Sequence, residues 1–443
     1  MRRLSSALLR RLCLGLIALL LASCGEQPIR TAPLDVTYAV TDLGVAPPHI
    51  SGDLIVPDAY IRRINSYGQI VGELNQATFF WTPTTPNGTT GARIDLASAL
   101  QTPCFDISAL NDFGQVAGVA HPSVSSNCDS SQGEARVFLW TPSAPNGAKG
   151  TVTYIEQGFG VWALNAWGQV LLNAHLHSLL WTPSTEHGTV GETTPILPVG
   201  EDDSDEAIGL NLYGQVIAQS YIKDRYSHAY LWTPAAAHGA TGALTILRSD
   251  GGEVIALNDF GQVLGMTSQG ASDYLWTPGS PNGTSGEMRY LPALSGDISA
   301  DFHGLSAEGL AYGISFSFGL FSERRHAVGW LPTGQNETRG KVVPLGAVGS
   351  DDDSMVSDMN AAGQVVGQSC TLTQGGNPVT CKTQAHAFIW DSTHGLHDLQ
   401  GALDDQVQFR LEDTQIISDQ GQIAAIGEDT SQMPHLLLLT PHR

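Results

Sequence analysis

A short phrase, Asn-x-x-Gly-Gln followed by an apolar pair, recurs along this chain and constrains its architecture more than any other feature. The last three of its eight copies are degenerate, and the eight begin at Asn65, Asn111, Asn165, Asn211, Asn258, Ser306, Asn360 and Ser418. A second, apolar phrase such as FFWTP or VFLWTP trails each copy. A unit this small cannot bury its own apolar face and must stack on a neighbour. The repeat therefore predicts one closed repeat domain.

Each copy has the composition of a four-stranded antiparallel unit. In the second copy, Asn111 can cap a tight turn through its side chain and Gly114 tolerates positive φ, which predicts a hairpin between two strands. The short apolar run VFLW is typical of a strand covered on both faces. The phrase TPxxPNG predicts a second turn, and a β-branched segment completes the unit.

Units of this kind are typical of propeller blades, which pack face to face around a central axis. We predict an all-β, eight-bladed β-propeller of four-stranded antiparallel blades over residues 36–443. The segment 36–44 lacks a turn phrase of its own, and the last copy ends where its fourth strand should begin. We expect this segment to supply the outer strand of the last blade and close the ring. The repeats are expected to begin near residues 59, 105, 159, 205, 253, 299, 354 and 407.

This topology sorts the loops onto two faces. The Asn-x-x-Gly turns and the TPxxPNG turns share one face, which we call the stereotyped face. The links between second and third strands and between blades share the opposite, variable face, where the sequence is long and irregular, as in SFSFGLFSERRH. Because binding residues concentrate on irregular loops held by a rigid scaffold, we expect the recognition surface on the variable face.

The N-terminus has the pattern of an export signal. Four arginines precede an apolar run over residues 12–22, which is too short to span a bilayer permanently. The run ends in Leu-Ala-Ser-Cys-Gly, which resembles the lipobox of bacterial lipoproteins. This resemblance implies a signal peptide over residues 1–23, a lipid on Cys24 and a tether over residues 24–35. Gly25 after the cysteine resembles the pattern sorted to the outer membrane; an ordinary secretory signal is the alternative.

Charge excludes one class of partner. The chain has 43 acidic and 21 basic residues, and four of the basic residues lie in the predicted leader, so the mature net charge is −26. A surface this acidic repels nucleic acid and anionic headgroups. We therefore expect no nucleic-acid partner.

Four cysteines remain once Cys13 leaves with the leader and Cys24 is lipidated, and four cysteines allow three pairings. An oxidising compartment favours disulfides. The predicted loops place two cysteines beside blade two and two around one loop of blade seven. They favour the pairs Cys104–Cys128 and Cys370–Cys381.

The seventh copy carries a family resemblance. Its phrases MNAAGQVVG, HAFIW and HDL, together with the opening segment TYAVTDLG, resemble the HAF repeat of exported bacterial proteins. The resemblance covers nearly the whole mature chain, although the His-Ala pair survives clearly only at His228, His326 and His386. It implies a repeat fold and an extracytoplasmic location, and it supplies no catalytic residues.

Repeated aromatic and histidine residues have structural interpretations. The aromatic third residue of five turns could stack on a flat ligand, but packing on the neighbouring blade explains it without one. The strand tryptophans are interpreted as core, and His187 and His238 as substitutes for Asn in the second turn. The five turn aromatics are Tyr67, Phe113, Trp167, Tyr213 and Phe260.

Acidic clusters between blades are candidate metal sites. Clustered carboxylates suit Ca²⁺, which seeks six to eight oxygen ligands. None has EF-hand spacing, and solvated acidic loops are the alternative. The candidate ligands are Asp202, Asp203, Asp205, Asp351, Asp352 and Asp353.

No catalytic motif is present in the sequence. We therefore expect a lipid-anchored, non-enzymatic binding or scaffold module, with a protein or glycan partner or a divalent ion on its variable face. The first alternative is a propeller enzyme, a lyase or glycoside hydrolase, with its site at the axial mouth of that face. The second is an envelope assembly factor that docks a partner on the stereotyped face.

Overall fold

The computed structural model describes residues 36–51, 54–121, 134–174, 177–196, 204–222, 225–267, 272–318, 323–373, 381–382, 384–404 and 407–442. The predicted signal peptide, Cys24 and the tether lie outside these residues. Among the described residues, no helix is long and apolar enough to cross a membrane.

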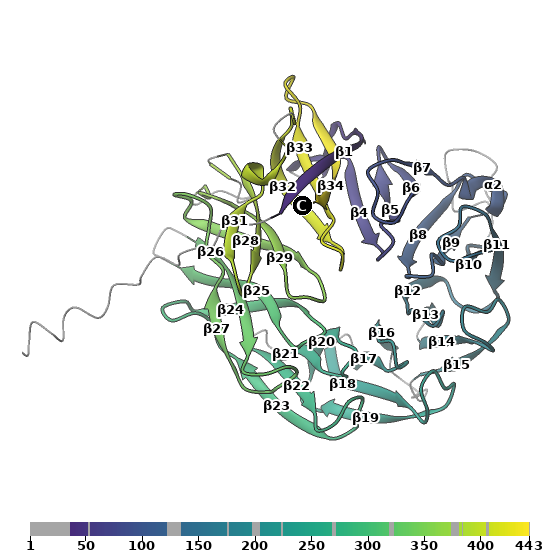
Figure 1. Ribbon diagram of the computed structural model, residues 1–443. Helices are drawn as coiled ribbons and strands as arrows, with labels where there is room; N and C mark the ends of the chain where they lie inside the picture. Colours follow the sequence, from purple (N-terminus) through teal and green to yellow (C-terminus); the bar gives the residue numbers. More distant parts are fainter. Residues whose placement is uncertain are drawn as a thin grey trace, which may run out of the picture.

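Eight four-stranded antiparallel sheets form a ring around a central axis (Figure 1), as predicted. Blade 1 consists of β4 (Ala59–Ile64), β5 (Ile70–Leu74), β6 (Ala77–Pro83) and β7 (Gly91–Arg93), and blade 2 of β8 (Phe105–Leu110), β9 (Val116–Ala120), β10 (Arg136–Pro142) and β11 (Gly150–Ile155). Blade 3 consists of β12 (Gly160–Leu164), β13 (Val170–Ala174), β14 (His177–Pro183) and β15 (Gly191–Pro195), and blade 4 of β16 (Ser204–Leu210), β17 (Val216–Ile222), β18 (Arg225–Pro234) and β19 (Gly242–Arg248).

Blades 5 to 7 continue the same order. Blade 5 consists of β20 (Gly252–Leu257), β21 (Val263–Thr267), β22 (Asp273–Pro278) and β23 (Gly286–Leu291). Blade 6 consists of β24 (Ser299–Leu305), β25 (Ala311–Phe318), β26 (Glu323–Pro332) and β27 (Gly340–Pro344). Blade 7 consists of β28 (Asp353–Met359), β29 (Val365–Cys370), β30 (His386–Asp391) and β31 (Gly395–Asp398).

Blade 8 joins the two ends of the chain. It combines β32 (Arg410–Ile417), β33 (Ile423–Glu428) and β34 (Pro434–His442) with β1 (Thr37–Val45). β1 pairs antiparallel with β34 from Thr37 opposite His442 to Val45 opposite His435. In Figure 1 the purple β1 lies among the yellow strands of the C-terminus. The predicted closure is confirmed, and the pairing removes an exposed sheet edge from each end of the chain.

Within the described residues, three short elements lie outside the blades. The hairpin of β2 (Pro48–Ser51) and β3 (Leu54–Pro57) separates β1 from blade 1. The helix α2 (Leu96–Leu100) links blades 1 and 2, and the 3-10 helix η2 (Gln400–Ala402) links blades 7 and 8. Asp95 caps α2 by accepting a hydrogen bond from the Ser98 N–H.

The turn phrase folds as its residues predict. In blade 1 the Asn65 carbonyl accepts from the Gly68 N–H at 2.9 Å, and the Asn65 Oδ1 accepts from the Gln69 N–H at 2.8 Å. Gly68 has φ +88°, and a Cβ there would lie 2.5 Å from the Gln422 side chain. The position therefore requires glycine for both backbone conformation and space.

The Asn and Gln side chains also form hydrogen bonds between neighbouring blades. The Asn65 Nδ2 donates to the Asn111 carbonyl, and the Gln69 Nε2 donates to the Asn146 carbonyl in the second turn of blade 2. The Asn bond recurs at 2.9–3.1 Å at six of the eight blade junctions. Among the described residues the bond is missing between blades 6 and 7 and between blades 8 and 1, where Ser306 and Ser418 stand in place of Asn and have no side-chain amide.

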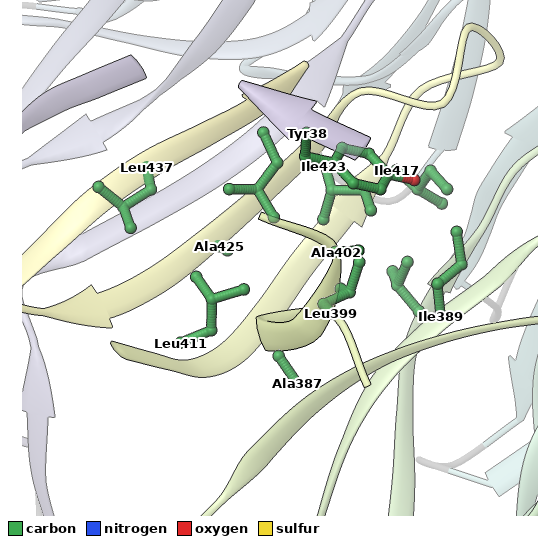
Figure 2. Packing of buried hydrophobic residues seen from close by; sticks show 12 residues of the cluster. Tyr38, Ala387, Ile389, Leu399, Ala402, Leu411, Ile417, Ile423, Ala425 and Leu437 are labelled. Carbon is green, nitrogen blue, oxygen red and sulfur yellow. The ribbon is translucent and has the colours of Figure 1, made fainter. Parts of the chain in front are cut away.

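The apolar phrases fill the space between blades. The seven strand tryptophans are at most 6% exposed, which confirms their assignment to the core. Figure 2 shows the cluster between blades 7 and 8, where Tyr38 of β1 packs with Ile389, Leu399 and Leu437. Because Tyr38 is only 2% exposed, the N-terminal strand contributes a side chain to the core between blades 7 and 8.

Candidate functional site

The innermost strands carry a repeated irregularity that shapes the inside of the ring. The first strands of neighbouring blades contact one another all the way round. In each of them the register slips by one residue, three positions before the first residue of the turn. Such bulges redirect a side chain and often accompany functional sites. The eight bulged residues are Arg62, Ser108, Trp162, Ile208, Ile255, His303, Ser357 and Gln415.

A pocket of about 1000 Å³ opens on the variable face over blades 7, 8 and 1. We call it the blade 8 pocket. Its walls are residues 57–60 around the start of β4, the end of β5 and its following turn, the link between β29 and β30, and the start of β32. Since only three adjacent blades contribute, the pocket lies to one side of the ring axis.

Two guanidinium groups beside the pocket are neutralised by carboxylates. The Arg410 Nη2 lies 2.7 Å from the Glu412 Oε1 and also contacts Glu428. The Arg62 Nη2 lies 2.5 Å from the Glu73 Oε1. Neither cation is therefore left to attract an anionic ligand.

The balance of charge at the blade 8 pocket is negative. Asp58, Glu73, Glu412 and Asp413 line it, and Glu428 adjoins it through Arg410. Among the described residues, these five carboxyl groups outnumber the two guanidinium groups by three, so they give the site up to three net negative charges. An acidic pocket favours neutral or cationic ligands and repels anions.

Asp413 is the most perturbed group of the pocket. Burial raises the pKa of its carboxyl to about 6, and a hydrogen bond from the Thr414 N–H, at 2.8 Å, opposes the shift. Within the described part of the chain this is the only hydrogen bond to the carboxylate, so its second oxygen is left to the pocket. Burial and the neighbouring Glu428 also raise the pKa of Glu412. Perturbed carboxyl groups in a cleft mark a candidate functional site.

The pocket wall is rigid on both sides. The Gln415 Oε1 accepts from the Ile61 N–H at 2.8 Å, and its Nε2 donates to the Ala59 carbonyl at 3.0 Å, so β32 is tied to β4. On the opposite side, Cys370 at the end of β29 forms a disulfide with Cys381, which lines the pocket. The predicted pairing of these two cysteines is present.

The remaining polar lining consists mainly of amides. Gln76, Gln368 and Gln384 line the pocket, and no described residue hydrogen-bonds to their side chains. Tyr60 lies at the rim with 56% of its surface exposed. The Arg62 guanidinium lies 5.5 Å from the centre of its ring.

The predicted metal ligands that lie within the described residues have hydrogen-bond or ion-pair partners in the protein. Asp205 accepts hydrogen bonds from the Ser178 N–H and faces His177 Nδ1 at 3.1 Å. Asp352 pairs with Arg324 at 3.0 Å, and Asp353 pairs with the same guanidinium at 3.1 Å. Among the described residues, no group of three or more His, Cys, Asp or Glu is placed to hold a metal ion. Asp202 and Asp203 lie outside these residues, so a Ca²⁺ site at their link stays a prediction.

Asp351 has a structural partner that recurs in the repeat. Its Oδ2 lies 2.8 Å from the His386 Nδ1, and the Asp297 Oδ2 lies 2.9 Å from the His326 Nδ1. Both aspartates stand nine residues before the first residue of their turns. This constant spacing was a signal in the sequence that could have revealed the pairs. In both blades the Asp–His pair connects the third strand to the link that precedes the blade.

The turn aromatics pack on the neighbouring blade in the two cases with a histidine partner. Phe113 stacks on His187 with ring centres 3.9 Å apart, and Trp167 stacks on His238 at 4.2 Å. Both histidines have positive φ, 54° and 60°, like the Asn residues they replace. Their interpretation as turn variants is confirmed. Burial lowers the pKa of both imidazoles.

Two of the predicted cysteines have no described position. Cys24 and Cys128 both lie outside the described residues. The lipid on Cys24 and the Cys104–Cys128 pair therefore stay predictions, although Cys104 is buried at 1% exposure.

Sequence reasoning missed the blade 8 pocket because its residues come from positions that vary between repeats. A partial signal exists in β32, which reads RLEDTQII and carries two register slips where other inner strands carry one. With Arg410, Glu412 and Asp413, β32 carries three charged residues, whereas no other innermost strand carries more than two.

The comparisons with known proteins give distant similarities of fold. No protein-family model matches the chain, and no curated protein matches it. Among solved structures, a streptogramin B lyase matches with a TM-score of 0.37 and 11% identity over 76% of this chain and 93% of its own. YCF48 from Cyanidioschyzon merolae matches with a TM-score of 0.36 and 11% identity over 91% and 98%. A virginiamycin B lyase from Staphylococcus aureus matches with a TM-score of 0.35 and 10% identity over 75% and 94%.

Proposed function

We propose that this protein is a non-enzymatic binding propeller that holds a small polar ligand, neutral or cationic, in the blade 8 pocket. The observation that carries the proposal is the combination of about 1000 Å³ of space with acidic groups and with three amide side chains to which no described residue hydrogen-bonds. This volume is at the upper end of the usual range for small-molecule sites. The rigid walls built by Gln415 and the Cys370–Cys381 disulfide would keep the site preformed.

Titration calorimetry with spermine and tetralysine, together with the oligosaccharides named below, tests this function. Glu412→Gln and Asp413→Asn should weaken binding of any cationic ligand by about tenfold each, because each removes a carboxylate that is poorly screened in the pocket. Glu287→Gln makes the same charge change at an exposed position of β23 and should leave affinity unchanged. Binding that is equal in all four proteins would place the ligand elsewhere.

A second candidate is an enzyme that uses Asp413 as a general acid. Its raised pKa of about 6 favours this role, because such a carboxyl keeps its proton closer to neutral pH than an ordinary one does. The two functions differ in the fate of the ligand. Chromatography of the ligand after long incubation distinguishes them: unchanged ligand supports a binding module, whereas products that disappear with Asp413→Asn support an enzyme.

We further propose that the propeller is anchored in the bacterial envelope, on the outer membrane, by a lipid on Cys24, and that it is an exported HAF-repeat lipoprotein. The proposal rests on the lipobox-like segment and on the repeat phrases of the sequence. Metabolic labelling with a fatty acid should mark the protein and should fail with Cys24→Ser. A Cys24→Ser protein that still carries label and sediments with membranes would contradict the anchor.

A further inference from the structure

We propose that the occupant of the blade 8 pocket is a short oligosaccharide without acidic groups, an inference that rests on the proposed binding function. Its first support is the chemistry of the lining amides. An amide presents two N–H donors and one carbonyl acceptor, and Gln76, Gln368 and Gln384 have no hydrogen-bond partner among the described residues. A ligand that both donates and accepts hydrogen bonds along the wall can pair with both ends of these amides. Sugar hydroxyls do both, whereas a polyamine offers donors only.

The carboxylates fit the same occupant. One oxygen of Asp413 accepts no hydrogen bond from the described residues, and Asp58, Glu73 and Glu412 line the same space. Carboxylates accept strong hydrogen bonds from hydroxyl and amine groups. With both nearby guanidinium groups already paired, an acidic sugar would meet unbalanced negative charge.

Tyr60 supplies an apolar surface of the right kind. Its ring is 56% exposed at the rim, and an aromatic ring gives a flat apolar face beside a polar hydroxyl. The C–H face of a pyranose ring can pack on such a surface. A peptide would need deeper apolar subsites for its side chains. The apolar lining residues are mostly small, as in Ala59 and Ala385.

The size of the pocket indicates more than one sugar ring. Its volume of about 1000 Å³ exceeds what one compact ligand requires. Cellotetraose and chitotetraose are neutral probes of suitable length. Deacetylated chitotetraose carries amines, and tetragalacturonate carries acids.

The experiment is titration calorimetry of these four tetrasaccharides and of tetralysine with the full-length protein. Two matched pairs of variants locate the site. Tyr60→Ala is compared with Tyr290→Ala, because both rings are 56% exposed and Tyr290 lies on the outer strand of blade 5. Gln76→Ala is compared with Gln432→Ala, because both residues are exposed in turns with φ of 60° and 62°.

We expect at least one neutral or amine-bearing tetrasaccharide to bind. Tyr60→Ala should weaken that binding about tenfold, as loss of a stacked aromatic contact of roughly 1.4 kcal/mol implies. Gln76→Ala should weaken it less, and the two control variants should bind like the wild type. Tetragalacturonate should not bind.

Three results overturn the inference in distinguishable ways. If only tetralysine binds, and Asp413→Asn weakens it, the proposed binding function survives but its occupant is a cationic peptide. If tetragalacturonate binds as tightly as the neutral sugars, or if Tyr60→Ala matches Tyr290→Ala, the sugar is not held in this pocket. If none of the probes binds, both the sugar and the proposed binding function are rejected.

Discussion

The side-chain amide of Asn65 donates a hydrogen bond to the backbone carbonyl of Asn111 at 3.0 Å, and this bond joins the turn of blade 1 to the turn of blade 2. Asn65 and Asn111 are both only 5% exposed. The repeated Asn therefore has two roles, since it caps its own turn through Oδ1 and bridges to the next blade through Nδ2. The repeated motif therefore forms a turn and also a hydrogen-bonded bridge between neighbouring blades.

Removal of one of these bridges should measurably lower the free energy of unfolding. Asn111→Ala deletes bonds to the Gln115 N–H, the Gln115 Oε1 and the Asn165 carbonyl, and it leaves these buried groups unpaired. We expect a loss of about 2–4 kcal/mol in the free energy of unfolding, measured by urea denaturation. Ser306→Ala, at a junction without the bridge, should cost about 1 kcal/mol. Equal losses in the two variants would show that the bridge adds nothing to the turn.

Glycine at the fourth turn position should not tolerate a methyl group. Gly114 has φ +88°, and its Cβ would lie 2.7 Å from the Gln69 Oε1 and 3.0 Å from the Asn146 Cα. Gly114→Ala should destabilise the fold by about 2 kcal/mol or more, because strain and a close contact add together. Gly401→Ala is the control, since a Cβ there meets nothing within 4 Å. Thermal unfolding that does not separate these variants would contradict the assigned backbone conformation.

Asp273 should make the fold less stable as pH rises. This residue is 2% exposed, and burial raises the pKa of its carboxyl from 3.8 to about 6. The folded state therefore binds the proton more tightly than the unfolded state, so stability is greatest at low pH and falls as pH rises between about 4 and 6. The decrease should be at most about 3 kcal/mol, since each pKa unit corresponds to roughly 1.4 kcal/mol.

The variant Asp273→Asn keeps an acceptor for the Phe302 N–H and should flatten this part of the pH profile of unfolding. Glu287→Gln, at an exposed position, should leave the profile as in the wild type. A wild-type profile that rises through this window would reverse the assigned direction of the pKa shift.

The Cys370–Cys381 disulfide should stabilise the fold and the pocket wall together. It closes a loop with a sequence separation of 11, and Cys370 is fully buried. Replacement of both cysteines by serine should lower the free energy of unfolding by about 2–4 kcal/mol. Denaturant unfolding with and without reductant measures this: reductant should destabilise the wild type toward the variant. If the doubly substituted protein is as stable as the wild type, the disulfide is not a structural element.

Most of the fold follows from local sequence signals. The order Asn111, Gly114, Gln115 specifies a turn through the side chain of one residue and the backbone freedom of another, both within a few residues. The turn phrase occurs eight times, and this number gives the number of blades. The pairing of β1 with β34 was predictable because one segment lacked a turn phrase and the last repeat lacked a strand.

The candidate site was far less predictable. Asp351 had been a candidate metal ligand, and its pairing with His386 depends on where the link between blades lies against the third strand. Clustered acids in sequence do not imply converging carboxylates, since neighbours at a strand entrance point to different sides. Asp352 and Asp353 instead meet Arg324.

The sequence by itself determined the number of blades, their order and the closure of the ring, because these follow from short-range turn chemistry repeated at regular intervals. Only the tertiary structure determined which residues line the blade 8 pocket. Tyr60, Gln368 and Asp413 come from three different blades and meet because the ring brings the first blade beside the last. The raised pKa of Asp413 has the same origin, since burial by the assembled blades is its largest cause and the neighbouring Glu412 adds to it.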